Sequence, residues 1–262
     1  MDRKVSKYEI FRISMKKDIV VGLGEIGLPI FKILSKNFPT EGFDKNSKLN
    51  VHKKSLENHE VDFLHVCIPF TKNFIHDVLK LEKKFTPKPI VIHSTISPHT
   101  TEKLQKKLKI PIIYSATRGV HKRMSRDLKR YVKFYSVYPT ANNSIRISKI
   151  FEKRFMQCKI KCKKMSSPLT LELAKIICDT SYYGWLINYA QISKIISDKE
   201  CVDYDEMWSF SDEIHKFLKN RPKMFPGFIG GHCVIPNLEL IDNSLLNQID
   251  KINKNFAKKK KS

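Results

Sequence analysis

The sequence predicts an α/β protein in two parts, a doubly wound parallel sheet followed by a smaller all-helical domain. Short apolar runs alternate with amphipathic stretches after Asp44, which is the pattern of parallel strands separated by helices. A glycine-rich turn directly follows the first apolar run, at 19–21. From 169 to 196 glycine and proline are absent apart from Gly184, so a long and largely buried helix is expected there.

The glycine-rich turn has the pattern G-x-G-x-x-G between an expected strand and an expected helix. Gly22 permits the tight turn, Gly24 lets the backbone approach a pyrophosphate, and Gly27 lets the helix pack closely on the strand. Free N–H groups at the start of that helix attract phosphate. Asp44 follows about twenty positions later and would accept hydrogen bonds from a ribose. The pattern predicts a Rossmann-type dinucleotide-binding domain, the alternative being a glycine turn that holds no ligand.

The identity of residue 44 also bears on the choice of dinucleotide. An acidic residue such as Asp44 favours NAD over NADP, because it pairs with a free 2′-hydroxyl group. Lys45 weakens this preference, since a cation there could meet a 2′-phosphate. We expect NAD as the cofactor.

The remaining apolar runs and amphipathic stretches define the expected elements of the sheet domain. Strands are expected at 61–68, 89–95, 110–114, 132–137 and, at the sheet edge, 158–163. Helices are expected at 73–81, 100–108 and 144–155. Ligands bind at the carboxyl ends of strands in open α/β sheets, so the turns that follow two of these strands are expected at the cofactor. The residues expected at the cofactor are Gly22, Gly24, Glu25, Ile26, Gly27, Asp44, Cys67, Pro69, Ser94 and Thr95.

The change in character near Met165 sets the expected domain boundary. The NAD-binding domain is expected at 15–164 and the helical domain at 165–257, with tails at 1–14 and 258–262. Within the helical domain, helices are expected at 169–196, 204–218 and 238–256.

Composition bounds the class of protein. The 262 residues are 41% hydrophobic, which is ample for a real core, and 49 Lys+Arg against 26 Asp+Glu give a formal charge of +23. The positive charge would concentrate polyanions near the surface. It is spread along the whole chain with no recognised reader motif, so we do not expect nucleic-acid binding.

Cysteine usage and hydropathy indicate a cytoplasmic protein. The six cysteines show no paired Cys-x-x-Cys spacing, so we expect reduced thiols and neither a disulfide nor a metal site. No stretch is long and uncharged enough to cross a bilayer, and the N-terminus lacks an apolar signal core. A membrane partner is therefore not expected.

A second group of special residues lies between the last two expected helices. Three glycines and two prolines at 225–236 force a tightly shaped loop, which contains Cys233 beside His232. A cation such as Lys175 or a protonated His232 would favour the reactive thiolate of this cysteine. The alternative is an inert buried thiol in a Gly/Pro turn.

Taken together, these motifs resemble the UDP-glucose/GDP-mannose dehydrogenase family. The similar segments, in chain order, are Gly22 to Pro29, Ser94-Thr95, Leu173-Ala174-Lys175 and Gly230-Gly231-His232-Cys233. The resemblance covers most of the chain and implies an NAD-binding domain followed by a helical domain that commonly forms a homodimer. It also implies a third, nucleotide-gripping domain, for which the sequence given has no counterpart.

The resemblance implies a specific chemistry. Members of this family oxidise a sugar hydroxymethyl group twice with NAD, through a thiohemiacetal and a thioester on a cysteine. By resemblance, Cys233 would be the nucleophile and Lys175 the cation that stabilises the developing oxyanion, with Thr95 near the cofactor. Lys175 and Asp179 lie four apart on one helix face and can share this site. Without the resemblance the two would be a surface ion pair.

Several positions depart from the family's pattern. The family usually has Asn where this chain has Asp179, and Asp where it has Asn237, so a hydrogen bond between the two positions could survive the exchange. The family's later Asn-Glu pair appears as Ala190-Gln191. The family's glutamate that helps hydrolyse the thioester has no counterpart in the basic segment 116–124. That segment could instead bind an anionic substrate, or it could be a solvated loop; its candidate residues, together with His232, are Arg118, His121 and Arg123.

The sequence therefore supports one leading function and two alternatives. The leading one is an NAD-dependent oxidoreductase acting on a sugar nucleotide or another anionic small molecule, with Cys233, Lys175, Asp179 and Asn237 as the catalytic group. A non-catalytic NAD-binding or regulatory protein of the same fold is the first alternative. A basic protein associated with nucleic acid is the second, and it rests on charge alone.

Overall fold

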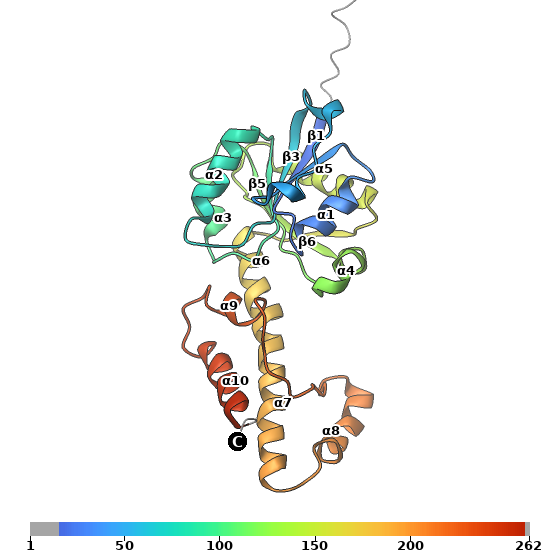
Figure 1. Cartoon of the computed structure of the whole chain (residues 1–262), viewed down its shortest axis with the longest axis vertical. Coiled ribbons are helices and arrows are strands. Elements are labelled where there is room, and N and C mark those ends of the chain that lie inside the picture. The colour runs from blue at the N-terminus through green and yellow to red at the C-terminus, as the bar shows by residue number, and fades with distance from the viewer. Residues whose placement is uncertain (1–15, 260–262) are drawn as a thin grey trace, which may run out of the picture. The chain divides into compact units, whose positions relative to one another are not determined.

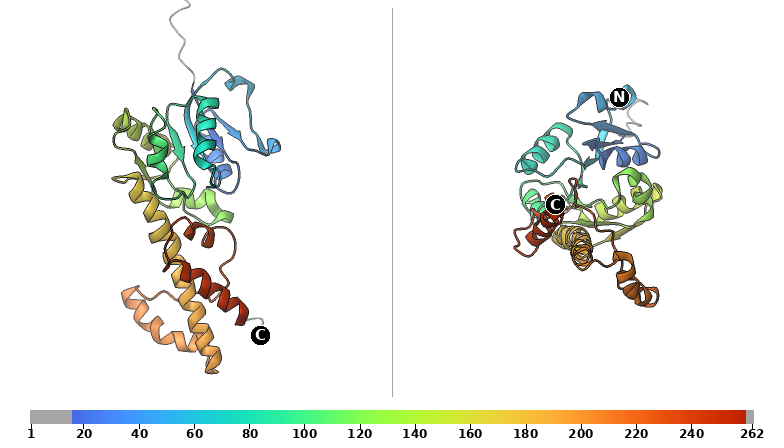
Figure 2. Two further views of the ribbon diagram at one scale, coloured as in Figure 1. Left: turned by 90° about the vertical axis from the view of Figure 1, so that its left-hand side faces the viewer. Right: turned by 60° about the horizontal axis from the view of Figure 1, so that its bottom comes forward.

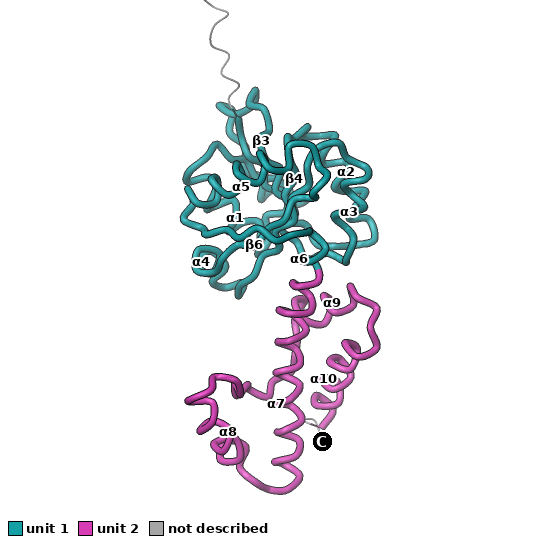
Figure 3. The backbone as a smooth tube through the Cα atoms, turned by 180° about the vertical axis from the view of Figure 1, so that it is seen from behind, with its two compact units in different colours: residues 1–172 teal, residues 173–262 magenta. Residues whose placement is uncertain are grey.

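A computed structural model describes residues 16–259 of the chain (Figure 1). It divides into two compact units, Met1–Glu172 and Leu173–Ser262, and the division falls inside helix α6 (Pro168–Ala174) (Figure 3). The expected N-terminal tail at 1–14, the expected domain start at residue 15 and the end of the expected C-terminal tail at 260–262 lie outside the described residues. No helix within 16–259 combines the length and apolar character needed to cross a bilayer.

The first unit is built on one seven-stranded sheet of order β2-β1-β3-β4-β5-β6-β7. Its strands are β1 (Lys16–Val21), β2 (Thr40–Phe43), β3 (Glu60–Val66), β4 (Ile90–Ile92), β5 (Ile112–Tyr114), β6 (Lys133–Val137) and β7 (Cys162–Lys164). All neighbouring pairs are parallel except β5 and β6. The α/β fold class with a predominantly parallel sheet is confirmed.

The antiparallel step has a simple physical origin. A parallel connection needs a crossover that carries the chain back over a face of the sheet. After β5 the chain instead forms a 3-10 turn (His121–Arg123) and helix α4 (Met124–Arg130), which packs against α1 (Gly27–Leu34). The chain therefore enters β6 from the edge at which β5 ends, and β6 runs in the opposite direction.

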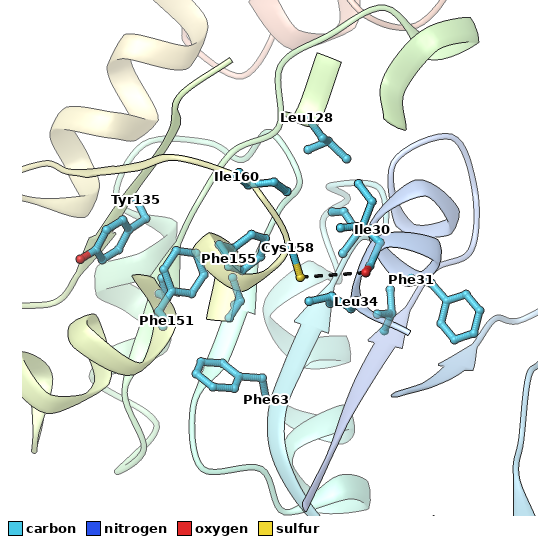
Figure 4. Packing of buried hydrophobic residues seen from close by; sticks show 14 of the residues in the cluster. Ile30, Phe31, Leu34, Phe63, Leu128, Tyr135, Phe151, Phe155, Cys158 and Ile160 are labelled. Atoms are coloured by element: carbon cyan, nitrogen blue, oxygen red, sulfur yellow. Dashed lines mark hydrogen bonds between the residues drawn. The ribbon is translucent and has the colours of Figure 1, made fainter. Parts of the chain in front are cut away.

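Helices cover both faces of the sheet (Figures 1 and 2). One core layer joins the sheet to α1, α4 and α5 (Ser144–Gln157), and the other joins it to α2 (Phe74–Phe85) and α3 (Thr100–Gln105). Alternate residues of each strand enter opposite layers, as Phe63 and Leu64 of β3 do. Figure 4 shows the first layer, where Phe63, Phe151 and Phe155 lie near one another and the Cys158 thiol faces the backbone of Ile33.

One strand and one α-helix of this unit were not predicted, β2 and α4. β2 places Glu41 and Gly42 among its four residues, so its apolar signal is weak. Glu41 is buried nonetheless, because its carboxylate pairs with Lys17 at 2.7 Å. In α4 only Met124 and Leu128 are apolar and buried, on a helix of seven residues with three basic side chains.

The second unit is helical. The end of α6 continues into a π-helical segment, η4 (Lys175–Ser181), then α7 (Tyr182–Lys199), α8 (Tyr204–Leu218), α9 (Ile235–Leu238) and α10 (Asn247–Lys259). The helix expected at 204–218 is confirmed at both ends. The single helix expected at 238–256 is wrong, because Asn243 accepts hydrogen bonds from the N–H groups of Leu245 and Leu246 and so stabilises a turn between α9 and α10. α10 also continues through Lys258 and Lys259, which were expected in the tail.

Helix α10 packs on α7 around a small apolar core. Its cluster consists of Ile176, Ile229, Val234, Leu238 and Ile249. Gly184 of α7 makes the close approach possible, since a Cβ there would lie 3.1 Å from Ile249 Cγ2 and 3.3 Å from Val234 Cγ1.

Candidate functional site

The glycine turn after β1 is as tight as its sequence predicts. Gly22 adopts a φ of 87°, and a Cβ on it would lie 2.8 Å from the carbonyl oxygen of Cys67. A Cβ on Gly27 would lie 1.7 Å from the carbonyl oxygen of Gly22. Both positions therefore exclude every other residue. Gly24 differs, because nothing lies within 4 Å of its Cβ position, which leaves open space beside the exposed backbone.

Asp44 lies beside this turn, at the carboxyl end of β2. Its Oδ2 accepts a hydrogen bond from the N–H of Leu23 at 2.6 Å, and its Oδ1 accepts one from the N–H of Asn46 at 2.9 Å. The β2 end is itself tied to the turn, since the N–H of Gly22 donates to Phe43 O at 2.8 Å. Each carboxylate oxygen keeps a further lone pair for a ligand hydroxyl.

The strands that carry the other expected residues end at the same edge. Val21 is in register with Val66, and Val66 with Ile92. The helix after β1 packs in one core layer and the helix after β3 in the other. Adjacent strands whose connections leave to opposite faces define the switch point at which open α/β sheets bind ligands.

Two turns complete this edge. The N–H of Cys67 donates to Val21 O at 2.8 Å, and the Ser94 hydroxyl donates to Ile68 O at 2.5 Å, so the turns after β3 and β4 are linked. Ser94 is buried, Thr95 and Cys67 are half-buried and Pro69 is exposed. The structure thus gathers the expected residues of four strands at one edge, with open space beside Gly24.

The remaining expected cofactor residues are Glu25 and Ile26. Ile26 packs against the first core layer, as a residue that anchors the start of α1. Glu25 lies 2.8 Å from His121 Nδ1, so the glycine turn contacts the basic segment that follows β5.

Each arginine of the basic segment already has an acceptor within the unit. The Arg118 guanidinium donates to Val132 O at 2.8 Å and lies over the Phe134 ring. Arg123 pairs with Asp127 at 3.0 Å. The Asp127 carboxylate also accepts from the N–H of Val120, which holds its pKa below the usual range. Their expected role as a pair of anion-binding forks therefore has no direct support from the geometry.

A row of buried polar side chains crosses the sheet next to these turns, and no sequence pattern indicated it. His65 Nδ1 lies 2.9 Å from His93 Nε2, and His93 Nδ1 lies 3.2 Å from Ser115 O. Lys133 donates to the same carbonyl at 3.1 Å. Because a carbonyl only accepts, neutral His93 carries its proton on Nδ1 and accepts the Nδ1 proton of His65. Burial lowers the pKa of both imidazoles, so both are neutral near neutral pH.

At the β1 end of this row lies a buried ion cluster. Both Arg154 donations to Asp18 measure 2.6 Å, and a third reaches Asp62 at 2.5 Å. Asp18 is fully buried. Arg154 therefore joins α5 to two strands and neutralises carboxylates that the sheet interior could not otherwise hold.

In the helical unit, Lys175 and Asp179 form the expected pair. Lys175 Nζ lies 2.5 Å from Asp179 Oδ2, and the lysine side chain is only 12% exposed against 44% for the aspartate. Both belong to the π-helical segment η4, where Thr180 donates to the carbonyl of Lys175. π-helical turns occur preferentially at functional sites.

The loop that carries Cys233 lies next to that segment. Val234 and Leu238 pack against Ile176, so the loop and η4 share one apolar cluster. Gly231 adopts a φ of 74°, which bends the chain just before the exposed residues His232 and Cys233. The structure therefore places the segment that bears Cys233 beside the segment that bears Lys175.

The expected hydrogen bond between Asp179 and Asn237 is not formed among the residues that the structure describes. Asn237 instead donates to the carbonyl of Cys233 at 2.6 Å, while Asp179 pairs with Lys175. The expectation failed because each side chain finds a partner four residues away on its own segment.

A buried network of amide side chains holds the backbone of the loop that carries Cys233. Gln191 of α7 donates to Gly227 O at 2.7 Å and to Asn253 Oδ1 at 3.0 Å. Asn253 of α10 exchanges hydrogen bonds with the N–H and the carbonyl of Ile229. Gln191 appeared in the sequence only as a departure, and Asn253 gave no signal, because its partners lie 24 and 62 residues away.

Neither a protein-family model nor a curated protein matches the sequence. Solved structures do. UDP-D-ManNAc dehydrogenase from Pyrococcus horikoshii is 18% identical with a TM-score of 0.75, over 92% of this chain and 68% of that one. UDP-N-acetyl-mannosamine dehydrogenase from Staphylococcus aureus is 18% identical with a TM-score of 0.69, over the same shares.

A structure of another kind of dehydrogenase is also similar. The 3-hydroxyisobutyrate dehydrogenase of Mycobacterium tuberculosis, in complex with L-serine, is 15% identical with a TM-score of 0.65, over 93% of this chain and 94% of that one. At such identities the likeness shows the fold, which is that of nucleotide-sugar dehydrogenases and related dehydrogenases.

Proposed function

We propose that the protein is an NAD-dependent oxidoreductase that oxidises a hydroxyl group of a sugar nucleotide or a related anionic molecule. The observation that carries the proposal is the turn Gly22 to Gly27 with Asp44 beside it, at the switch point of the sheet. The similarity in fold to UDP-sugar dehydrogenases supports the same reaction class.

In this proposal the turn residues hold the cofactor. The backbone around Gly24 binds the pyrophosphate, the Asp44 carboxylate accepts from a ribose hydroxyl, and Ser94 and Thr95 line the cofactor from the end of β4. Bound NAD would supply the acceptor for the hydride that leaves the substrate carbon.

The helical unit would supply the reacting groups. The Cys233 sulfur, as thiolate, would bond to the carbonyl carbon of the aldehyde formed by the first oxidation. The Lys175 ammonium would donate a hydrogen bond to the oxygen that becomes negative when this bond forms. Asp179 holds that ammonium in place, and Asn237 fixes the backbone at Cys233.

Two substrate classes follow from the similar structures. A UDP-sugar is the first, from the UDP-sugar dehydrogenases. A small hydroxy acid is the second, because the chain matches nearly the whole length of the 3-hydroxyisobutyrate dehydrogenase. Oxidation of a small hydroxy acid needs no cysteine adduct, so the two classes differ in their dependence on Cys233.

Turnover with matched cysteine variants tests the proposal. Purified protein is incubated with NAD and with UDP-sugars or small hydroxy acids, and NADH formation is followed. Wild type and Cys201→Ser, which alters another exposed cysteine of the same unit, should turn over a UDP-sugar, whereas Cys233→Ser should give no net turnover. Turnover of a hydroxy acid by Cys233→Ser would select the second substrate class. Binding of NAD without turnover of any substrate would overturn the enzymatic proposal in favour of a non-catalytic NAD-binding protein.

We also propose that the helical unit forms a homodimer through α7. Large apolar side chains recur every three or four residues on one exposed stripe of this helix, which is the spacing of helix pairing. The stripe consists of Tyr182, Trp185, Tyr189, Ile192 and Ile196. Light scattering should find a dimer for wild type and for Lys199→Ala, and a monomer for Tyr189→Lys; a monomeric wild type would contradict the proposal.

A further inference from the structure

Lys133 is a buried cation of the sheet unit. Its side chain begins in β6, the residue is 5% exposed, and its ammonium group donates to Ser115 O at 3.1 Å. The Phe155 ring centroid lies 5.6 Å from the same nitrogen. Within 16–259 no carboxylate lies within ion-pair distance of it. A charged group in such surroundings is unfavourable for stability unless a partner compensates it.

The groups that face Lys133 cannot neutralise it. Burial raises the pKa of the Cys67 thiol to about 12 and that of the Cys162 thiol to about 11, so both remain protonated. Burial also lowers the pKa of Lys133 itself, from 10.5 to about 8. The titratable and charged groups around the ammonium are Cys67, Cys162, His65, His93 and Arg118. None of them is negative near neutral pH.

The position of this cation connects it with the nucleotide site. Ser115, which accepts from it, directly follows β5. Cys67, which interacts with its charge, belongs to the turn after β3. His93, whose Nδ1 also hydrogen-bonds the Ser115 carbonyl oxygen, directly precedes Ser94 and Thr95 in the sequence. The ammonium is therefore bound at the end of β5 and shares its acceptor with His93, which is adjacent in sequence to two residues assigned to the cofactor.

We propose that Lys133 sets the preference of this site between oxidised and reduced nicotinamide. A positive charge behind the turns opposes binding of the positively charged ring of NAD and leaves the neutral ring of NADH unaffected. The rest of the dinucleotide is common to both forms, so its interactions cancel in the ratio of the two dissociation constants. The inference rests on the proposed dinucleotide site.

The test is the ratio of the dissociation constant of NAD to that of NADH, measured by calorimetry at about pH 7 and about pH 9.5, on either side of the titration of a buried lysine. Between these values Lys133 loses its proton. The ratio for wild type should fall by about fivefold as the opposing charge disappears. This comparison uses the unaltered protein and does not depend on whether any variant folds.

Two variants separate charge from packing. Lys133→Arg keeps a cation that cannot lose its proton, so its ratio should remain at the wild-type value of the lower pH. Lys133→Met keeps much of the buried chain without charge, so its ratio should equal the wild-type value of the higher pH at both pH values. Lys164→Met, which alters an exposed residue of β7, should follow wild type.

The outcomes are distinct. A wild-type ratio that is the same at both pH values, or a Lys133→Met ratio that still changes with pH, overturns the role of Lys133 while the dinucleotide site stands. A protein that binds neither NAD nor NADH overturns the proposed function, and this inference with it. A merely structural role of Lys133 would weaken both forms equally and leave the ratio unchanged.

Discussion

Asp44 and Leu23 are joined by a hydrogen bond of 2.6 Å from the Leu23 N–H to the Asp44 carboxylate, across 21 residues of sequence. The bond ties the end of β2 to the glycine turn after β1. A carboxylate beside a turn with a φ of 87° at Gly22 is the arrangement in which a ribose and a pyrophosphate are bound side by side. The hydrogen bond that fixes the backbone of the turn therefore also positions the carboxylate of the candidate cofactor site.

Replacement of Asp44 by Ala should weaken NAD binding by about tenfold or more, because charge-assisted hydrogen bonds to the ribose are worth about 1.5–3 kcal/mol. The Leu23 N–H also loses its acceptor, so Asp44→Asn is the control that keeps an oxygen at this position. Calorimetry with NAD and NADP should show a smaller loss for NADP, whose 2′-phosphate the carboxylate repels. Unchanged NAD affinity in both variants would remove Asp44 from the site.

A methyl group should have different effects at two glycines of the turn, on stability at Gly27 and on NAD binding at Gly24. Gly27→Ala should destabilise the fold severely, since its Cβ would lie 1.7 Å from a carbonyl oxygen. Gly24→Ala has no neighbour within 4 Å of its Cβ and should leave the free energy of unfolding within about 0.5 kcal/mol of wild type. It should nevertheless weaken NAD binding, because the methyl group occupies the space in front of the backbone. Urea unfolding and calorimetry measure both effects, and a Gly24→Ala protein that binds NAD normally would refute this use of the open space.

The Arg154 cluster should dominate the stability of the sheet. Arg154→Met leaves the carboxylates of Asp18 and Asp62 without their partner and should lower the free energy of unfolding by about 3–5 kcal/mol. Arg146→Met, at an exposed position of the same helix, should change it by less than about 0.5 kcal/mol. Denaturant unfolding of the two variants is the measurement. Equal stabilities would mean that the cluster is not formed.

Stability should fall on mild acidification because of the two buried imidazoles. In the folded protein the pKa values of His65 and His93 lie below the ordinary 6.5. Below about pH 6.5 the unfolded chain therefore binds protons that the folded chain does not, and the free energy of unfolding decreases as pH falls. A His65→Asn/His93→Gln double variant should show a flatter profile between about pH 7 and pH 5, measured by urea unfolding. An equally steep profile in the double variant would assign the effect to other groups.

Local signals explain which parts of the fold were predictable. Helix α8 agrees with its predicted range 204–218 at both ends; in the structure Asp203 caps its first turn and Lys219 ends it in the left-handed conformation. The turn at Gly22 and Gly27 was predictable because the spacing of the glycines is itself the constraint. The break between α9 and α10 was not predicted, because the apolar pattern continues through the turn that Asn243 stabilises.

Long-range polar contacts could not be predicted. Arg154 meets Asp18 across 136 residues, and Gln191 meets Asn253 across 62. No local pattern marks such pairs, because their partners are set only when the sheet and the helical unit have formed. Lys133 resembled any other lysine of a basic chain, and only its burial distinguishes it.

Whether the glycine turn binds a dinucleotide can be measured by calorimetric titration of NAD into the wild-type chain. We expect one saturable site per chain, with affinity in the range usual for cofactors and substrates, about 1 μM to 1 mM. The site should be weakened by Asp44→Ala and by Gly24→Ala. Absence of saturable binding by a folded wild-type protein would contradict the assignment of the glycine turn as a dinucleotide site, and with it the proposed function.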